Sequence, residues 1–294
     1  MYRDFDKNRV VNALGIVFSQ LCGTMQAHLE GSPLLGMQMG FNARNAIISC
    51  DIAAHGIPAP KDVFEGKFGY YQLFEEDHNL PKILPSLGKK WRINEISHKP
   101  FPSGRATHGI IDACLIARKK NNLHFKSIKS VEAKVPSLVH LLVGRPAKSN
   151  METNYARLCA QFTAARVLIS GRLIASDFLI NRINDFQTLE LAHKIHLTVD
   201  NNPDPNTLTP ITVTIKLNDG DTVCEKIMDV YGSVSKPMVK DQWQKKFITN
   251  WSLAADKLKY NDCHEVIKRI DRLENEQKIA GLINKLTIPT SDTY

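Results

Sequence analysis

Apolar residues recur every three to four positions through the first third of the chain, which is the spacing of helices buried on one face. The first such stretch covers residues 8–28. The second, 40–55, is apolar nearly all round, so we expect it to be deeply buried. A short helix is expected after Pro60, before Gly66 and Gly69 interrupt the pattern. The first part of the chain is therefore predicted to be all-helical.

The period changes near Trp91, where residues 91–96 are expected to form a strand. Residues 127–135 alternate between apolar and polar, which predicts a half-buried strand. Two helices are expected next, over 153–170 and 186–194. Three further strands follow them, over 195–199, 211–217 and 222–228. This mixture predicts an α+β fold.

The segment from Ser235 returns to helical spacing, with Trp243, Phe247 and Trp251 four residues apart and a further helix over 266–273. Three parts are expected. Residues 1–97 form part of a helical domain, 98–234 form an α+β domain, and 235–294 form a helical tail that returns to the first domain.

The segment His98–Asp112, HKPFPSGRATHGIID, carries the densest candidate chemistry. Its two prolines hold the approach extended. Ser103 is predicted to be the N-cap of a helix that runs to Lys120. Free amides at a helix N-terminus attract anions, and Lys99 and Arg105 lie beside them. The segment is therefore expected to receive a carboxylate or a phosphate.

Bulk composition narrows the function classes. The net charge is +8, yet the basic residues are scattered without interleaved aromatics, so no nucleic-acid partner is expected. No apolar run is long enough for a membrane span, and the N-terminus has no signal-peptide core, so a cytoplasmic location is expected. The six cysteines lack paired spacing, which predicts buried free thiols in a reducing compartment. No motif for a metal, a nucleophile elbow or a phosphate loop is present.

Four motifs occur in the order found in one known family: EGKFGYYQLF, HKPFPSGRATHGIIDA, ISGRL and YGSVSKPM followed by WQKKF. On these motifs the whole chain resembles the MmgE/PrpD family, which includes 2-methylcitrate dehydratase, cis-aconitate decarboxylase and iminodisuccinate epimerase. The resemblance implies a helical domain interrupted by a smaller α+β domain. It also implies a homodimer without metal or organic cofactor, and a small di- or tricarboxylate substrate bound between the domains.

The resemblance also has gaps. Chains of the family are longer at the N-terminus, where they carry an acid and a histidine of the site. A missing N-terminal segment or companion chain is therefore one expectation. Decarboxylase-type members have a histidine where this chain has Gly104, and a tyrosine where it has Phe162. Leu35 and Gln38 stand where many members have Lys and His. Decarboxylation of cis-aconitate is therefore disfavoured.

Lys99 and His108 are the candidate catalytic residues. Lys99 is expected to neutralise a substrate carboxylate or, if desolvated, to move a proton; the alternative is a surface lysine. His108 lies four residues before Asp112, which is expected to support it by fixing the tautomer of its imidazole. Such a pair suits proton abstraction next to a carboxylate. A structural histidine is the other interpretation.

The candidate substrate-binding residues are Arg44, Arg105, Gln38, Asn42 and Ser103. Arg105 is predicted to grip a carboxylate through two parallel hydrogen bonds, or else to form an ion pair between domains. Arg44 needs a partner in an apolar helix, either the substrate or a neighbouring Asp or Glu. Gln38 can bind substrate but cannot act as a base, and Asn42 has the alternative role of a helix cap.

Two functions follow from the sequence. The first is a lyase or isomerase, of the dehydratase or epimerase type, acting on a small di- or tricarboxylate by proton abstraction next to a carboxylate. The second is a non-catalytic truncated paralogue or split-gene half, which needs an N-terminal partner or only binds a carboxylate or protein.

Overall fold

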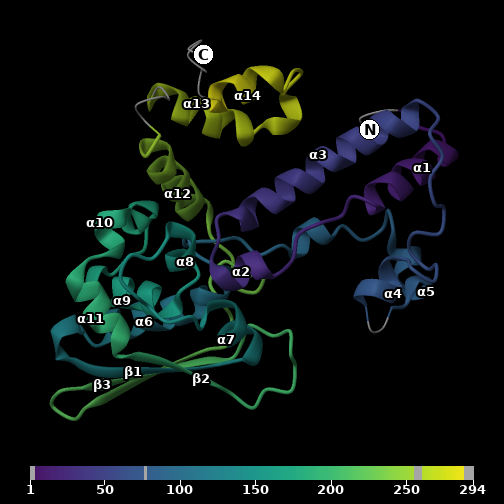
Figure 1. The fold of residues 1–294 in the computed structure, drawn as a ribbon. Helices are drawn as coiled ribbons and strands as arrows, with labels where there is room; N and C mark the ends of the chain where they lie inside the picture. Colours follow the sequence, from purple (N-terminus) through teal and green to yellow (C-terminus); the bar gives the residue numbers. More distant parts are fainter. Residues whose placement is uncertain (1–3, 76–77, 255–259, 288–294) are drawn as a thin grey trace. The chain divides into compact units, whose positions relative to one another are not determined.

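The computed structural model describes residues 4–75, 78–254 and 260–287 (Figure 1). Contacts within the chain divide it into two units, Met1–Asn94 and Glu95–Tyr294. The first unit is helical, and the second combines helices with a four-stranded sheet, so the predicted α+β fold class is confirmed. The predicted return of the tail to the helical domain stays a prediction.

The first unit contains two long helices and several short ones. Its described part contains α1 (Lys7–Phe18), α2 (Gln26–Glu30), α3 (Leu34–Ala54), α4 (Tyr70–Phe74) and α5 (Leu80–Ile83), followed by 3-10 turns at Leu84–Ser86 and Arg92–Glu95. Helix α1 begins after Asp6, whose carboxylate accepts a hydrogen bond from the amide of Arg9 at 2.8 Å.

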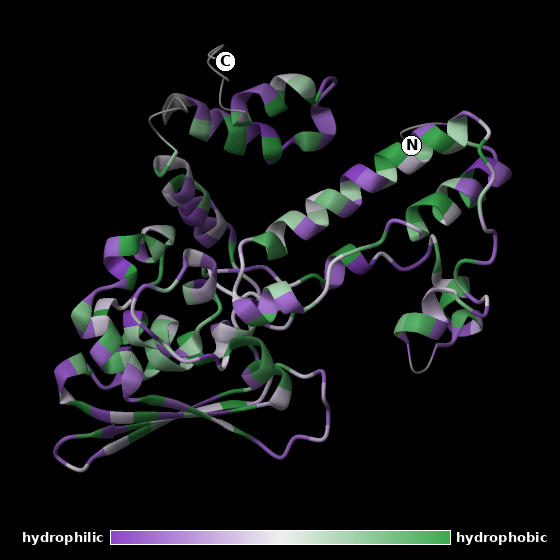
Figure 2. Ribbon diagram, viewed as in Figure 1, coloured by the Kyte–Doolittle hydropathy of each residue, from purple (hydrophilic) through white to green (hydrophobic). Residues whose placement is uncertain are grey.

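Helix α3 packs on α1 through a narrow face (Figure 1). Asn45, Ser49 and Ala53 are buried there, and their spacing of four places them on one side of the helix. Ile47 and Ile48 remain 50% and 42% exposed, and Figure 2 shows further apolar positions along this helix. The prediction that this segment is deeply buried is wrong, because small and polar residues make its contact with α1.

Three local predictions for the first unit are also wrong. The helix expected over 8–28 ends at Phe18, and Gly23 has a φ of 100°, so the chain turns before α2. The expected helix after Pro60 is a series of turns, in which the amide of Tyr70 donates to the carbonyl of Val63. The strand expected over 91–96 is a 3-10 turn.

The sheet of the second unit has the order β2-β1-β3-β4. Its strands are β1 (Ile128–Val135), β2 (Ile195–Val199), β3 (Ile211–Leu217) and β4 (Thr222–Ile227). Strand β1 runs parallel to β2 and antiparallel to β3, and β3 is antiparallel to β4. These strands confirm the alternation in the sequence, since β1 and β3 bury every second residue along most of their length.

Helices cover one face of this sheet (Figure 1). They are α6 (His108–Lys120), α9 (Ala160–Ser170) and α11 (Phe186–His193), with the shorter α7 (Ser137–Val143), α8 (Thr153–Arg157) and α10 (Ile180–Ile183) around them. The single helix expected over 153–170 is thus two helices, because Cys159 is extended between them. The second of these helices, α9, ends as predicted at Gly171, whose φ is 70°.

The chain then forms α12 (Lys240–Ser252), α13 (Tyr260–Ile270) and α14 (Ala280–Leu286). A small core of their own joins these helices, and it contains Trp251, Cys263, Val266 and Leu282. Helix α12 confirms the predicted spacing of Trp243, Phe247 and Trp251.

All six cysteines are free. Burial raises the pKa of the Cys114 thiol to about 12 and that of Cys159 to about 11, so both thiols stay protonated at neutral pH. The prediction of buried thiols is wrong for Cys22 and Cys224, which are exposed.

Candidate functional site

The approach to α6 is fixed by contacts with residues far along the chain. The amide of His98 donates to the carbonyl of Gly232 at 2.8 Å, and its ring lies edge-on to Trp243 of α12, with 4.1 Å between the ring centroids. Gly232 has a φ of 88°, and a Cβ on it would collide with the carbonyl oxygen of His98. Only glycine fits there, so the extended approach and the turn at Gly232 hold each other in place.

Ser103 is not an N-cap, and this prediction is wrong. Its hydroxyl is buried and lies 2.8 Å from the hydroxyl of Thr107, which donates to the carbonyl of Gly104. A 3-10 turn, Arg105–Thr107, stands between Ser103 and the first residue of α6. The two hydroxyls therefore stabilise this turn.

Gly104 lies against α8 and the residue that follows it. Its amide donates to the carbonyl of Arg157 at 2.9 Å, and a Cβ at position 104 would lie 2.7 Å from Cδ2 of Leu158. Any side chain at this position requires Leu158 to move. The absence of a histidine here therefore agrees with the local packing.

The guanidinium of Arg105 binds backbone carbonyls. It donates to Tyr231 at 2.9 Å and to Val230 at 3.5 Å, and its Nη1 lies 3.2 Å from Nδ1 of His108. Burial lowers its pKa, while the charge of Asp112 acts in the opposite direction. These contacts tie the start of α6 to the loop after β4. They are neither the carboxylate grip nor the ion pair between domains that the sequence suggested for Arg105.

His108 is fully buried at the start of α6, and Phe101 lies edge-on to its ring at 5.3 Å. Burial, and then the charge of Arg105, lower its pKa to about 3, so the imidazole is neutral at physiological pH. Its Nε2 has no hydrogen-bond partner among the described residues. This geometry favours the structural interpretation, and a catalytic role for His108 stays a prediction.

The predicted pairing of His108 with Asp112 is wrong. The carboxylate of Asp112 forms a 2.7 Å ion pair with Lys236, which lies between Gly232 and α12. Residues four apart can share a helix face, but a lysine competes better than a neutral imidazole for a carboxylate. Asp112 therefore fastens α6 to the segment before α12.

Lys99 is exposed and lies close enough to Lys246 of α12 to affect its ionisation. Burial, and then the positive charge of Lys99, lower the pKa of Lys246. Neither ammonium group forms an ion pair with a described residue. Sequence reasoning counted Lys246 among the scattered basic residues and did not predict that it lies near Lys99. Only the tertiary contact of α12 with the approach segment brings the two lysines together.

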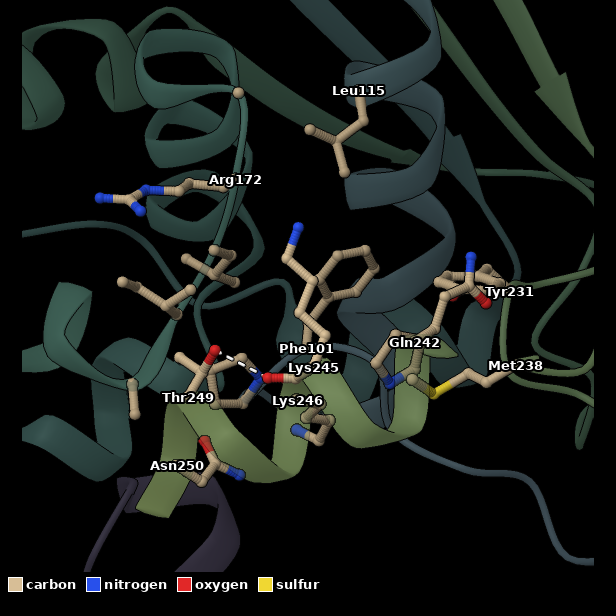
Figure 3. Close-up of a pocket in the computed structure, with 16 residues that line it drawn as sticks. Phe101, Leu115, Arg172, Tyr231, Met238, Gln242, Lys245, Lys246, Thr249 and Asn250 are labelled. Carbon is tan, nitrogen blue, oxygen red and sulfur yellow. Dashed lines mark hydrogen bonds between the residues drawn. The ribbon is translucent and has the colours of Figure 1, made fainter. Parts of the chain in front are cut away.

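A cavity of about 290 Å³ opens beside this pair (Figure 3). Its walls come from the approach segment, α6, the loop after α9, the turn at Tyr231 and α12. Lys245, Lys246 and Arg172 line it, and among the described residues no acidic side chain does. Cations without a balancing carboxylate make the cavity suited to an anion.

The first unit holds the other three candidates, on α3. Gln38 and Asn42 lie one turn apart and donate to the carbonyls of Thr24 and Cys22, both at 3.3 Å. Asn42 is therefore no helix cap. Asn45 extends the row by donating to the carbonyl of Gln20 at 3.2 Å, and sequence reasoning missed it. Together these amides anchor the chain between α1 and α2.

The side chain of Arg44 is exposed, whereas the sequence predicted that it lies in a buried, apolar helix. It donates to the side chain of Asn45 and lies over the ring of Phe41, 5.5 Å from the centroid. The expected partner, a neighbouring Asp or Glu, is not the one observed. Substrate binding by Arg44, Gln38 and Asn42 stays a prediction.

Comparison with protein families decides the wider relationship. Residues 101–271 match the MmgE/PrpD C-terminal domain, and residues 2–82 match the MmgE/PrpD N-terminal domain. The chain belongs to the MmgE/PrpD family. The order of its two matched domains follows the order of its two structural units.

Cis-aconitate decarboxylases are among its MmgE/PrpD relatives. The human enzyme is 28% identical over an aligned length of 290 positions, gaps included, which covers 95% of this chain and 57% of the enzyme. The enzyme of Aspergillus terreus is 24% identical over 93% of this chain and 59% of its own length. The mouse enzyme is 26% identical over 86% and 52%. The chain thus spans between half and three fifths of these relatives.

None of the helices in the described part of this MmgE/PrpD protein is both long and apolar enough to cross a bilayer.

Proposed function

We propose that this MmgE/PrpD protein acts as a lyase or isomerase on a small di- or tricarboxylate, by moving a proton next to a carboxylate. The observation that carries the proposal is the pair Lys99 and Lys246 beside a cavity with no acidic lining. Membership of a family with carboxylate-processing relatives supports it.

Each lysine has a separate role in the proposal. Lys99 is exposed, so it supplies positive charge to a substrate carboxylate without a desolvation cost. Lys246 is partly buried, and its lowered pKa brings it closer to neutral pH, where an amine can accept a proton. In this proposal Lys99 holds a carboxylate of the substrate, and Lys246 accepts the proton from the adjacent carbon. The reaction after proton removal is either loss of water or reprotonation.

Deuterium exchange tests this proposal without knowledge of the product. Full-length protein is incubated in D₂O with succinate, citrate, tricarballylate and cis-aconitate, and proton NMR follows the signal next to each carboxylate. We expect exchange with at least one acid, and a loss of about 10²–10⁴-fold in its rate for Lys246→Gln. Lys99→Ala should chiefly weaken binding.

Lys119→Gln is the matched control, because Lys119 is an exposed lysine of α6 outside the cavity. Its exchange rate should equal that of the wild type. A thermal-shift measurement on the same acids separates the alternatives, since a ligand of the folded state raises its stability. Stabilisation without exchange would contradict catalysis and favour the non-catalytic carboxylate binder. The absence of both would contradict a carboxylate site.

A further inference from the structure

We propose that His98 and Trp243 are positioning residues, whose ring contact holds helix α12 against the approach segment and so keeps Lys99 and Lys246 close to each other. This inference rests on the proposed function, because these two lysines bind the carboxylate and move the proton. It adds two side chains that act through the lysines and need not touch the substrate.

Each ring belongs to a residue that is close in the chain to one of the lysines. His98 directly precedes Lys99, and Trp243 lies three residues before Lys246 on α12. The two rings meet edge-on, with 4.1 Å between their centroids and 81° between their planes. Residues three apart are neighbours on a helix surface, so the contact that fixes Trp243 also fixes the place where Lys246 leaves the helix.

A second connection fixes the start of α12. Gly232 accepts a hydrogen bond from the amide of His98 and donates one to the carbonyl of Lys236, both at 2.8 Å. The ammonium of Lys236 forms the ion pair with Asp112, and α12 begins four residues later at Lys240. This turn holds the beginning of the helix, and the ring contact holds its first turn. Together the two connections set the direction of α12.

The two lysines need such a contact because like charges repel each other. Burial, and then the charge of Lys99, lower the pKa of Lys246. Burial and Arg105 lower the pKa of His108 most, and the charges of both lysines lower it further, so both lie near the start of α6. Among the described residues no carboxylate pairs with either lysine and offsets the repulsion.

The ring contact and the repulsion are of similar size. Two unit charges about 4 Å apart in water disfavour their approach by about fivefold. An edge-to-face pair of aromatic rings favours contact by about two- to tenfold. Loss of the rings should therefore be enough to let α12 move away from the approach segment.

Competitive acetylation with acetic anhydride, followed by mass spectrometry, measures the pH at which Lys246 is half protonated in the full-length protein. His98→Ala removes an exposed ring and keeps the backbone hydrogen bond to Gly232, so the variant should remain folded. The midpoint of Lys246 should rise towards that of an ordinary lysine, because Lys99 moves away. His98→Phe should restore the midpoint of the wild type, because it supplies a ring again.

Deuterium exchange gives the second measurement. A displacement of about 1 Å can cost about 100-fold in rate, so exchange by His98→Ala should be slower by up to about 100-fold. Affinity for the acid should change less, since Lys99 remains. His193→Ala is the control, because it removes an exposed histidine of α11, and it should match the wild type in midpoint and rate.

A double variant tests whether the two rings act together. Trp243→Leu combined with His98→Ala should raise the midpoint no further than either change alone, since both remove one contact. An unchanged midpoint in His98→Ala, or full additivity of the two changes, would overturn the inference while the proposed function stands. The expected midpoints in a protein that exchanges no deuterium would support the ring contact and contradict the proposed function.

Discussion

The imidazole of His108 is held in its neutral form by two features at the start of α6. Full burial removes the water that a cation needs, and the guanidinium of Arg105 lies 3.2 Å from Nδ1. The backbone of Ser103 favours the charged form, but the two opposing effects exceed it. Protonation of His108 must therefore disturb the packing around Phe101 and Arg105.

Acid stability measures this effect. The folded-state pKa of His108 is about 3, whereas a histidine in an unfolded chain titrates near 6.5. Between these values the unfolded chain binds more protons, so the free energy of unfolding falls as pH falls below about 6.5. Well below pH 6.5 each pH unit costs about 1.4 kcal/mol, and the loss between pH 6.5 and pH 5 is about 1.6 kcal/mol. Urea unfolding of the wild type at several pH values should show this loss.

His108→Asn should remove most of that slope, although its stability at pH 7.5 falls because the ring no longer fills its site. His193→Asn is the control, since His193 is exposed, and it should keep the slope of the wild type. If His108→Asn left the slope of unfolding free energy against pH unchanged, His108 would be accessible to protons in the folded protein. It would then again be a candidate proton carrier.

Helix α6 approaches strand β3 through a glycine. A Cβ on Gly109 would lie 2.5 Å from Cδ1 of Ile211, a residue that is itself buried. Gly109→Ala should therefore destabilise the protein by about 1–3 kcal/mol through overpacking. The change in the free energy of unfolding follows from the midpoint of urea unfolding and from its dependence on urea concentration.

Gly40→Ala makes the same chemical change in α3, where nothing lies within 4 Å of the added atom. It should stabilise by up to about 1 kcal/mol, because alanine favours the helix. Destabilisation of both variants by the same amount would contradict the close approach of α6 to β3.

The elements that sequence predicted best are those with an unambiguous period. Strands β1 and β3 bury alternate side chains, so the pattern and the structure agree. The break after Phe18 was not predictable in this way, because Leu21 and Met25 continue the helical spacing although both lie exposed beyond α1. Local spacing records which residues are apolar, and only the packing decides where a helix ends.

The same distinction applies to the candidate site. The segment around Lys99 was predictable, because its prolines and charges are adjacent in the sequence. Lys246 and the cavity were not, because α12 reaches this segment only through tertiary contacts such as that of Trp243 with His98. His108 and Asp112 satisfied a helix-spacing rule, yet Arg105 and Lys236 supplied stronger partners.

At the scale of the whole molecule, the two units differ in the extent of their cores. Ala13, Ala53 and Val63 are the buried apolar side chains in the described part of the first unit. The second unit has a continuous buried cluster that joins β1, β3, α6 and α9. Because burial of apolar surface is the main stabilising contribution, local opening of the first unit should require less free energy.

Hydrogen exchange followed by mass spectrometry resolves the two units in the full-length protein. Peptides from α1 and α3 should exchange faster than peptides from β1 and α6, by several powers of ten if the latter open only on global unfolding. The helix α12 joins a smaller core, so its exchange should be intermediate. Equal protection of α3 and α6 would contradict this order. It would mean that the apolar positions of α3, such as Ile47 and Ile48, are covered in solution, and the predicted homodimer would then be the first interface to examine by sedimentation.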